Sequence, residues 1–217
     1  MKKHRAVIFD LDGTLVNSLE DIADSVNRSL AQLGFPKHDV EAFKIFTGDG
    51  REVMANRALP REHRDETTTK KLVGLIDVEY SKCWSNKTRP YAGIPELLDE
   101  LTAKRIKLAV LSNKDQHFTE LMVSKLLNRW HFEAVAGILP GGVKKPEPEG
   151  AFKIARQFQL EPSEFAFVGD TDVDMKTATA AGMFPVGALW GFRSHEELVK
   201  GGAKSVIEHP SELLHLQ

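Results

Sequence analysis

Short, almost uninterrupted apolar runs alternate with amphipathic segments along most of this 217-residue chain, and this alternation restricts its fold more than any other feature. A run such as Ala-Val-Ile-Phe at residues 6–9 is typical of a parallel strand, which is covered on both faces and so lacks polar alternation. Strand followed by helix at this interval predicts an α/β fold with a doubly wound, Rossmann-like parallel sheet. Strands are expected at 6–9, 106–111, 134–139, 165–168, 185–189 and 205–207, and helices at 95–104, 116–128, 150–159 and 172–181.

Residues 16–89 interrupt this alternation. Their apolar residues recur at helical spacing, as at Ile22, Val26 and Leu30, and no convincing strand is present. We therefore expect a core α/β domain made of residues 1–15 and 90–217, with an all-helical domain at 16–89 inserted after the first strand.

Composition excludes several classes of function. The chain has 29 basic and 31 acidic residues, a net charge of −2, which argues against a nucleic-acid partner. No continuous apolar stretch reaches the roughly 20 residues of a membrane span. The only cysteine, Cys83, can form neither an internal disulfide nor a multi-cysteine zinc site. We expect a cytoplasmic protein without a membrane partner, and both a monomer and a homodimer remain open.

Two acidic pairs follow predicted strands. Asp10 and Asp12 come directly after the first strand, where Gly13 allows a sharp turn, and Asp170 and Asp174 follow the strand at 165–168. A solvated Asp-Gly turn explains the first pair as well as a site does, and helix capping is the alternative for the second pair. Two strand ends that both carry clustered carboxylates favour a cation site, and oxygen ligands of this kind suit Mg²⁺.

Polar residues after two further strands are candidate anion ligands. Ser112 and Asn113 would offer a hydroxyl and backbone N–H groups at a helix start, although a plain helix N-cap fits them equally well. Lys145 precedes Pro146 in a proline-stiffened loop, and its ammonium group suits phosphate, although most loop lysines are merely solvated.

These four motifs, in this order, resemble the haloacid-dehalogenase-like superfamily. They are Asp10-Leu11-Asp12-Gly13-Thr14, Leu111-Ser112-Asn113, Lys145-Pro146-Glu147-Pro148, and Gly169-Asp170 with Asp174. The helical insertion looks like the C1 cap domain of that superfamily. The end of the chain, with Leu189-Trp190-Gly191-Phe192, is similar to the phosphoglycolate-phosphatase-like branch.

The resemblance implies a role for each motif. Asp10 would be the nucleophile that forms an aspartyl-phosphate, and Asp12 the general acid and base. Asp10, the backbone carbonyl of Asp12, and Asp170 would hold Mg²⁺, with Asp174 as a further ligand or as a residue that orients one. The phosphate-binding groups would be Ser112, the amide of Asn113, and Lys145.

The resemblance also implies that the inserted helical domain selects the substrate. Gly48 and Arg51 lie in its most loop-like segment, and Arg51 could pair with a substrate carboxylate, whereas a simple turn between two helices would explain the glycines alone.

The first choice of function is a Mg²⁺-dependent phosphatase that hydrolyses a small phosphorylated metabolite, phosphoglycolate or a similar phosphate monoester. A phosphomutase of the β-phosphoglucomutase type is the second choice, although Thr14 leans against it because such mutases usually carry valine there. A non-catalytic binding protein on the same scaffold is the third.

Overall fold

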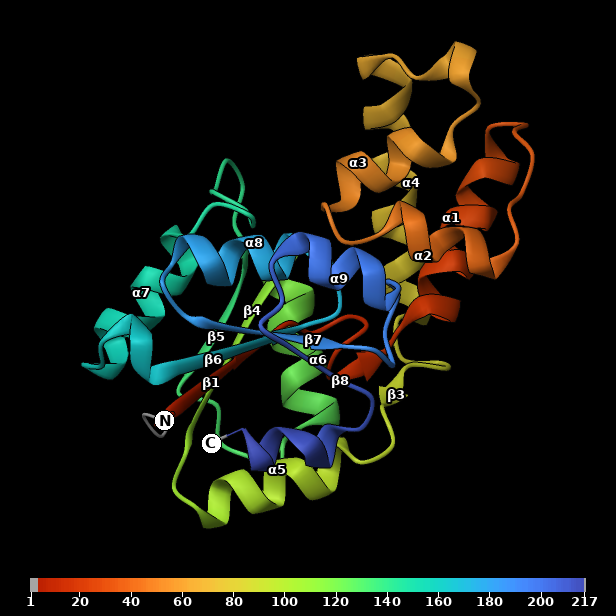
Figure 1. Ribbon diagram of the computed structural model, residues 1–217. Coiled ribbons are helices and arrows are strands. Elements are labelled where there is room, and N and C mark those ends of the chain that lie inside the picture. Colours follow the sequence, from red (N-terminus) through yellow and green to blue (C-terminus); the bar gives the residue numbers. More distant parts are fainter. Residues whose placement is uncertain (1–3, 217) are drawn as a thin grey trace. The chain divides into compact units, whose positions relative to one another are not determined.

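The computed structural model describes residues 4–216 and divides the chain into two compact units (Figure 1). The first unit contains the chain up to Val16 and again from Pro90, and the second unit is Asn17–Arg89. The basic start of the chain at residues 1–3 and the last residue, Gln217, lie outside the described residues.

The first unit is built on a six-stranded parallel sheet in the order β5-β4-β1-β6-β7-β8. The sheet is flanked by α5 and α6 on one face and by α7, α8 and α9 on the other (Figure 1). This arrangement confirms the predicted doubly wound α/β fold. Its strands are β1 (Ala6–Phe9), β4 (Lys107–Asp115), β5 (Ala134–Ile138), β6 (Phe165–Gly169), β7 (Phe184–Ala188) and β8 (Ser205–Ile207), and its helices are α5 (Ile94–Ala103), α6 (Gln116–Leu126), α7 (Glu149–Phe158), α8 (Asp172–Ala180) and α9 (His195–Gly201), with the 3₁₀ turns η3 (Pro162–Glu164) and η4 (Pro210–His215).

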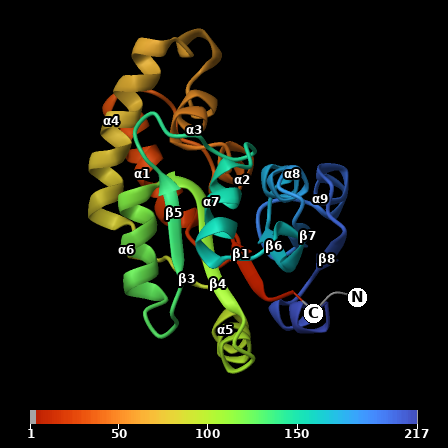
Figure 2. The ribbon, with the colours of Figure 1, turned by 90° about the vertical axis from the view of Figure 1, so that its left-hand side faces the viewer.

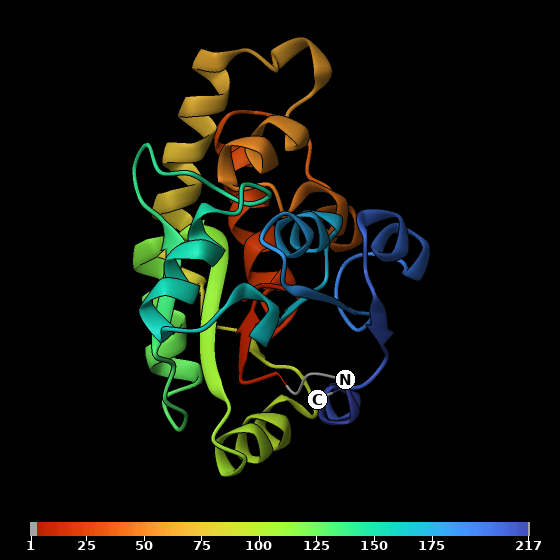
Figure 3. The same ribbon diagram turned by 60° about the vertical axis from the view of Figure 1, so that its left-hand side comes forward.

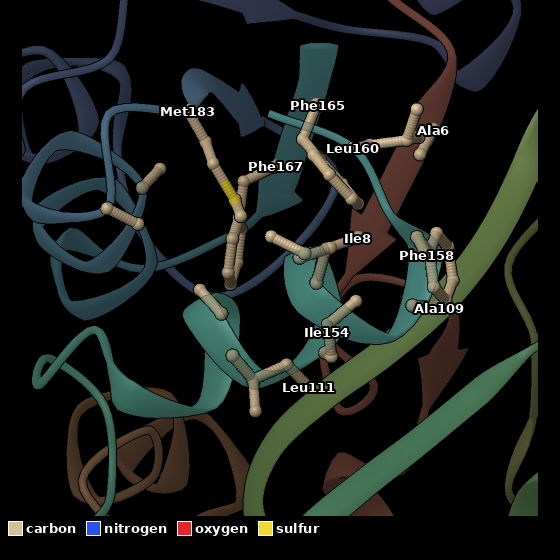
Figure 4. Close-up of a cluster of buried hydrophobic side chains, with 14 residues drawn as sticks. Ala6, Ile8, Ala109, Leu111, Ile154, Phe158, Leu160, Phe165, Phe167 and Met183 are labelled. Carbon is tan, nitrogen blue, oxygen red and sulfur yellow. The ribbon is translucent and has the colours of Figure 1, made fainter. Parts of the chain in front are cut away.

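The strands β1 and β6 are apolar because both faces of the sheet are covered. All four residues of β1 and all five of β6 are buried. On the α7 side, Ile154 and Phe158 of the helix pack with Ile8, Phe165 and Phe167 of the strands (Figure 4). Truncation of one such core side chain to alanine typically costs about 3–5 kcal/mol. This packing makes the middle of the sheet a firm support for whatever lies at the strand ends.

The long strand β4 lies between β5 and β1 (Figures 2 and 3). It extends four residues beyond the predicted end of its apolar run, to Asp115. The added residues are polar, and the apolar pattern therefore could not reveal them.

The second unit is helical. It contains α1 (Leu19–Gln32), α2 (Phe43–Phe46), α3 (Arg51–Ala58) and α4 (Glu66–Cys83), with the 3₁₀ turns η1 (Val40–Ala42) and η2 (Arg61–His63). Helix α1 packs along α4, and the predicted face of α1 is the buried one, with Ile22, Val26 and Leu30 in the interior. Cys83, at the end of α4, is a buried free thiol.

Two short strands lie where the chain passes between the units. β2 (Val16–Asn17) pairs with β3 (Arg89–Pro90) in a separate two-stranded sheet, which the sequence pattern does not predict. Within the helical unit, buried Asp21 accepts hydrogen bonds from the backbone N–H groups of Lys87 and Thr88 at 2.9 and 2.8 Å, and from the Thr88 hydroxyl at 2.7 Å. This carboxylate therefore fastens the returning chain to the start of α1.

No helix within residues 4–216 is long and apolar enough to cross a membrane.

Candidate active site

The first unit brings acidic side chains to the carboxyl ends of its central strands. β1 lies between β4 and β6, and Phe9 is opposite Val110 on one side and Val168 on the other. The residues that directly follow β1 and β6, Asp10 and Asp170, are both buried. In open α/β sheets, ligands bind beyond these strand ends, where the direction of the strand order reverses. The two acids therefore occupy the expected position of a site.

Asp10, Asp170 and Asp174 form one buried carboxylate cluster. One oxygen atom of each lies within 4.8 Å of the others. The cation of the cluster is Lys145, whose Nζ lies 2.9 Å from Asp10 Oδ1 and 2.6 Å from Asp174 Oδ1. The structure thus brings together four residues that the sequence places in three separate motifs.

Burial sets the protonation of these groups. It raises the pKa of Asp10 to about 6, with the Lys145 charge opposing and the Asp174 charge reinforcing the rise. Burial also raises the pKa of Asp170 well above its ordinary value, and the nearby charges of Asp10 and Asp174 add to this. Burial alone would lower the pKa of the Lys145 ammonium group, but Asp10 and Asp174 hold it above its ordinary value. Three carboxylates thus share one cation, and full ionisation leaves a buried net charge of −2.

The cluster fits a divalent cation. Asp10 Oδ1 is a buried oxygen that makes no hydrogen bond to any described residue, although Lys145 lies close to it. An all-carboxylate donor set suits Mg²⁺, which takes oxygen ligands, rather than the softer metals that favour thiolate or imidazole. A dication would also balance the charge of −2. The candidate ligands are therefore Asp10, Asp170 and Asp174.

Neighbouring donors fix the orientation of two of these acids. Thr14 Oγ1 donates a hydrogen bond to Asp170 Oδ1 at 3.0 Å, and the backbone N–H of Phe192 donates to Asp170 Oδ2 at 2.9 Å. The N–H and hydroxyl of Thr171 donate to Asp174 Oδ2 at 3.0 and 2.7 Å. One Asp174 oxygen thus caps α8, as the capping alternative predicts, while the other faces Lys145 and is the one left to contact a cation.

Two glycines allow the backbone to approach Asp170. Gly13 has a φ of +87°, and a side chain there would bring its Cβ to 2.7 Å from Asp170 Oδ1. At Gly191, a Cβ would lie 2.5 Å from the carbonyl oxygen of Gly13 and would collide with Asp170. Neither position has room for a methyl group, so the site depends on both glycines.

Ser112 and Asn113 differ from expectation in their local structure. The sequence predicts them at a helix start, and this is wrong: both belong to β4, and α6 begins at Gln116 behind an Asp115 cap. The register between β4 and β5 shifts here. Leu111 lies opposite Ala136 and Asp115 lies opposite Ile138, so β4 has extra residues between these two pairs. This irregularity releases Ser112 and Asn113 from regular pairing with β5.

The Asn113 side chain holds the loop that carries Lys145. Its Nδ2 donates to the carbonyl of Lys145 at 3.0 Å, and its Oδ1 accepts from the Lys145 N–H at 2.8 Å. The Lys145–Pro146 bond in this loop is cis. The family resemblance gives a role to the backbone amide of Asn113. The structure adds a role for its side chain, which holds the backbone of Lys145.

Asp12 stands apart from the carboxylate cluster and has its own cation. Lys114 Nζ lies 3.2 Å from Asp12 Oδ1 and 3.1 Å from Oδ2. Lys114 directly follows the Ser112-Asn113 pair, but no sequence motif assigns it a role. Tyr91 is a second residue near Asp12 that no sequence motif singles out. Burial raises the pKa of its hydroxyl, and the negative charges of Asp170 and Asp12 raise it further.

Gly48 and Arg51 lie in the helical unit. Gly48 has a φ of +109°, so the turn alone accounts for this glycine. Arg51 begins α3, and its Nη1 lies 3.1 Å from both carboxylate oxygens of Asp77. Its guanidinium group thus already pairs with an acid of its own unit.

The chain resembles known proteins over its whole length. Residues 7–188 match the family model of haloacid dehalogenase-like hydrolases. The chain is 32% identical over 212 residues to a phosphoglycolate phosphatase of Aquifex aeolicus, with 98% of this chain and 96% of that protein covered. It is also 32% identical to a phosphoglycolate phosphatase of Haemophilus influenzae, with 95% of each covered.

A solved structure agrees in fold. The crystal structure of a predicted phosphoglycolate phosphatase from Haemophilus somnus superimposes with a TM-score of 0.90 at 27% identity, covering 100% of this chain and 99% of that one. These matches confirm the resemblance to the phosphoglycolate-phosphatase-like branch and the expected enzyme class, a phosphatase. The chain belongs to the haloacid dehalogenase-like hydrolase family.

Proposed function

We propose that this protein is a Mg²⁺-dependent phosphatase that hydrolyses a small phosphate monoester through an aspartyl-phosphate at Asp10. The observation that carries the proposal is the meeting of Asp10, Lys145, Asp170 and Asp174 beyond the central strands. A phosphoryl group is multiply charged, so its transfer requires cations around the phosphorus and a nucleophile in line with the leaving oxygen.

Asp10 and Asp12 perform the two halves of the reaction. In the first half, an Asp10 carboxylate oxygen attacks phosphorus, the bond from phosphorus to the ester oxygen breaks, and Asp12 gives its proton to the departing alkoxide. In the second half, Asp12 takes a proton from water, the water oxygen bonds to phosphorus, and the bond from phosphorus to Asp10 breaks. Inorganic phosphate leaves and both carboxyl groups regain their starting states.

The remaining residues bind and orient. The Ser112 hydroxyl, the Asn113 N–H and the Lys145 ammonium group bind the non-bridging phosphate oxygens, and the Asn113 side chain keeps Lys145 in place. Asp10, Asp170 and Asp174, together with the Asp12 carbonyl, would hold Mg²⁺. Such an ion would supply positive charge that offsets the charge of the phosphate, so that the Asp10 anion could approach it.

The substrate we propose is phosphoglycolate or a similarly small phosphorylated acid, the activity named for the relatives from Aquifex and Haemophilus. We assign substrate selection to the helical unit as a cap domain, with Arg51 and Gly48 in its specificity segment. The proposed location is the cytoplasm, in keeping with the buried free thiol of Cys83.

The test is phosphate release from a panel of phosphate esters, with Mg²⁺ and with EDTA. We expect Mg²⁺-dependent release that is fastest with small phospho-acids and lost in Asp10→Asn. Conversion of a sugar phosphate to its isomer, with little free phosphate, would favour the phosphomutase instead. Binding of esters without any turnover would favour a non-catalytic protein.

A further inference from the structure

A second, partly buried ion pair lies beside the carboxylate cluster. Lys114 Nζ contacts both carboxylate oxygens of Asp12, at 3.2 and 3.1 Å. The Lys114 and Asp12 side chains are 10% and 17% exposed, so solvent screens this pair far less than a surface pair. A cation that touches both oxygens holds the carboxylate in place.

The backbone of Lys114 is held on several sides. Its N–H donates to the Ser112 hydroxyl oxygen at 3.2 Å, and its carbonyl accepts from Thr119 Oγ1 at 3.4 Å. The strand β5 also passes close by, because a Cβ on Gly137 would lie 2.7 Å from the Lys114 carbonyl. Lys114 itself sits in the stretch where pairing of β4 with β5 is irregular. Such irregularities re-aim side chains near active sites.

The two lysines divide the acids between them. Lys145 pairs with Asp10 and Asp174, whereas Lys114 pairs with Asp12. The pairing holds Asp12 toward β4, outside the group of Asp10, Asp170 and Asp174. A carboxylate that drifted into that group would compete with the substrate phosphate for cations.

We propose that Lys114 is a positioning residue that holds the Asp12 side chain beside the leaving oxygen: when one Asp12 oxygen carries the proton that it gives to the leaving oxygen, the other keeps its contact with Lys114 Nζ. This proposal rests on the proposed phosphatase function and on the acid role of Asp12 within it. Proton transfer requires a short, well-aligned contact, so a loosely held acid loses rate even when its chemistry is unchanged. Lys114 acts through Asp12 and makes no bond to the phosphoryl group.

The test uses the dependence of rate on the leaving group. An alkoxide such as that of glycerol phosphate needs a proton as it departs, whereas p-nitrophenolate departs readily without one. The ratio kcat/KM reports the steps up to the phosphorylated enzyme and so isolates this departure from the later attack by water. Wild type, Lys114→Met and Asp12→Asn are compared on phosphoglycolate, glycerol phosphate and p-nitrophenyl phosphate, with Lys176→Met as the matched control.

For Lys114→Met we expect kcat/KM for both alkyl phosphates to fall roughly 10- to 100-fold, a part of the 10²–10⁴-fold that general acid–base catalysis supplies. For p-nitrophenyl phosphate we expect a fall of no more than about threefold, on the same principle. In the Asp12→Asn background, Lys114→Met should cause no further loss on alkyl phosphates, because the two residues act as one unit. Lys176, an exposed residue of α8 that pairs with Asp172, should tolerate methionine with all three substrates.

Three results would overturn the proposal. An equal loss with all three esters would assign Lys114 to phosphate binding or to stability. A loss confined to KM for phosphoglycolate, with glycerol phosphate unaffected, would make Lys114 a ligand for the substrate carboxylate. Additive losses in the double variant would separate Lys114 from Asp12. Failure of the wild type to release phosphate from any ester would instead refute the proposed function itself.

Discussion

Replacement of Lys145 by methionine probes the electrostatic balance of the site. Lys145 is 3% exposed and lies 2.9 Å from Asp10 and 2.6 Å from Asp174. Loss of one partner from a buried ion pair typically costs about 3–5 kcal/mol, because the remaining charges are left uncompensated. For a chain of this size, 1 kcal/mol shifts Tm by about 2–4 °C, so we expect Lys145→Met to melt roughly 6–20 °C below wild type in EDTA at neutral pH.

The difference in Tm between Lys145→Met and wild type should depend on pH. Asp10 has a pKa raised to about 6 from its ordinary 3.8, so the folded protein binds more protons than the unfolded chain between these values. The contribution of Asp10 to the stability of the metal-free protein therefore falls as pH rises from about 4 to about 6. The Lys145 charge opposes this rise in the pKa of Asp10, so its removal extends the loss to higher pH. The Tm gap between variant and wild type should be small near pH 5 and wide near pH 8, by the same linkage.

Differential scanning calorimetry with and without Mg²⁺ measures both effects. Mg²⁺ should raise the Tm of Lys145→Met more than that of wild type, because the variant cluster is more negative. The matched control is Lys144→Met, which changes an exposed lysine of the same loop and should stay within about 0.5 kcal/mol of wild type. A Lys145→Met protein as stable as this control in EDTA, or a deficit that does not change with pH, would refute the reasoning.

Three further substitutions test other parts of the molecule. Asp10→Asn should abolish turnover while circular dichroism stays that of wild type; retained phosphate release would remove Asp10 as the nucleophile. Asp21→Ala leaves the buried donors of Thr88 without their acceptor and should destabilise the helical unit by about 3 kcal/mol in urea, whereas Asp24→Ala, at a partly exposed site, should change little. Gly191→Ala should displace Asp170 and weaken the Mg²⁺-induced rise in Tm. Gly74→Ala, with open space around it, should leave that rise unchanged. An unchanged Mg²⁺ effect in Gly191→Ala would contradict the close contact between this glycine and Asp170.

Much of the fold could be predicted because a strand that is buried on both faces appears in the sequence as a short run of apolar residues. The β1 and β8 strands lie at the predicted positions, and β6 extends only one residue further. The end of β4 is different. Its last residues are polar, and their extension comes from an irregular pairing with β5 that apolar spacing cannot report. The short β2 and β3 are equally hidden, since two residues carry no pattern.

The candidate site likewise contains residues that the sequence predicts and residues that it does not. Asp10 and Asp170 could be located because a charged residue directly after a buried strand is conspicuous in sequence. Lys114 and Thr14 could not be assigned, since each gains its role from a partner that is far away along the chain, Asp12 and Asp170 respectively. At Asp174 the sequence left capping and metal binding as alternatives; the structure shows the cap on one oxygen and Lys145 on the other.

The most direct test of the account is the chemical state of Asp10 during turnover. Wild-type protein is mixed with Mg²⁺ and p-nitrophenyl phosphate, whose leaving group needs no proton from Asp12, then quenched in acid within the turnover time, digested and analysed by mass spectrometry, with Asp12→Asn treated in parallel. The account predicts one added phosphoryl group on the peptide that contains Asp10, in larger amount in Asp12→Asn because its removal by water is slowed. Phosphate release by an enzyme that never carries a phosphoryl group on Asp10, or carries it elsewhere, would contradict the account.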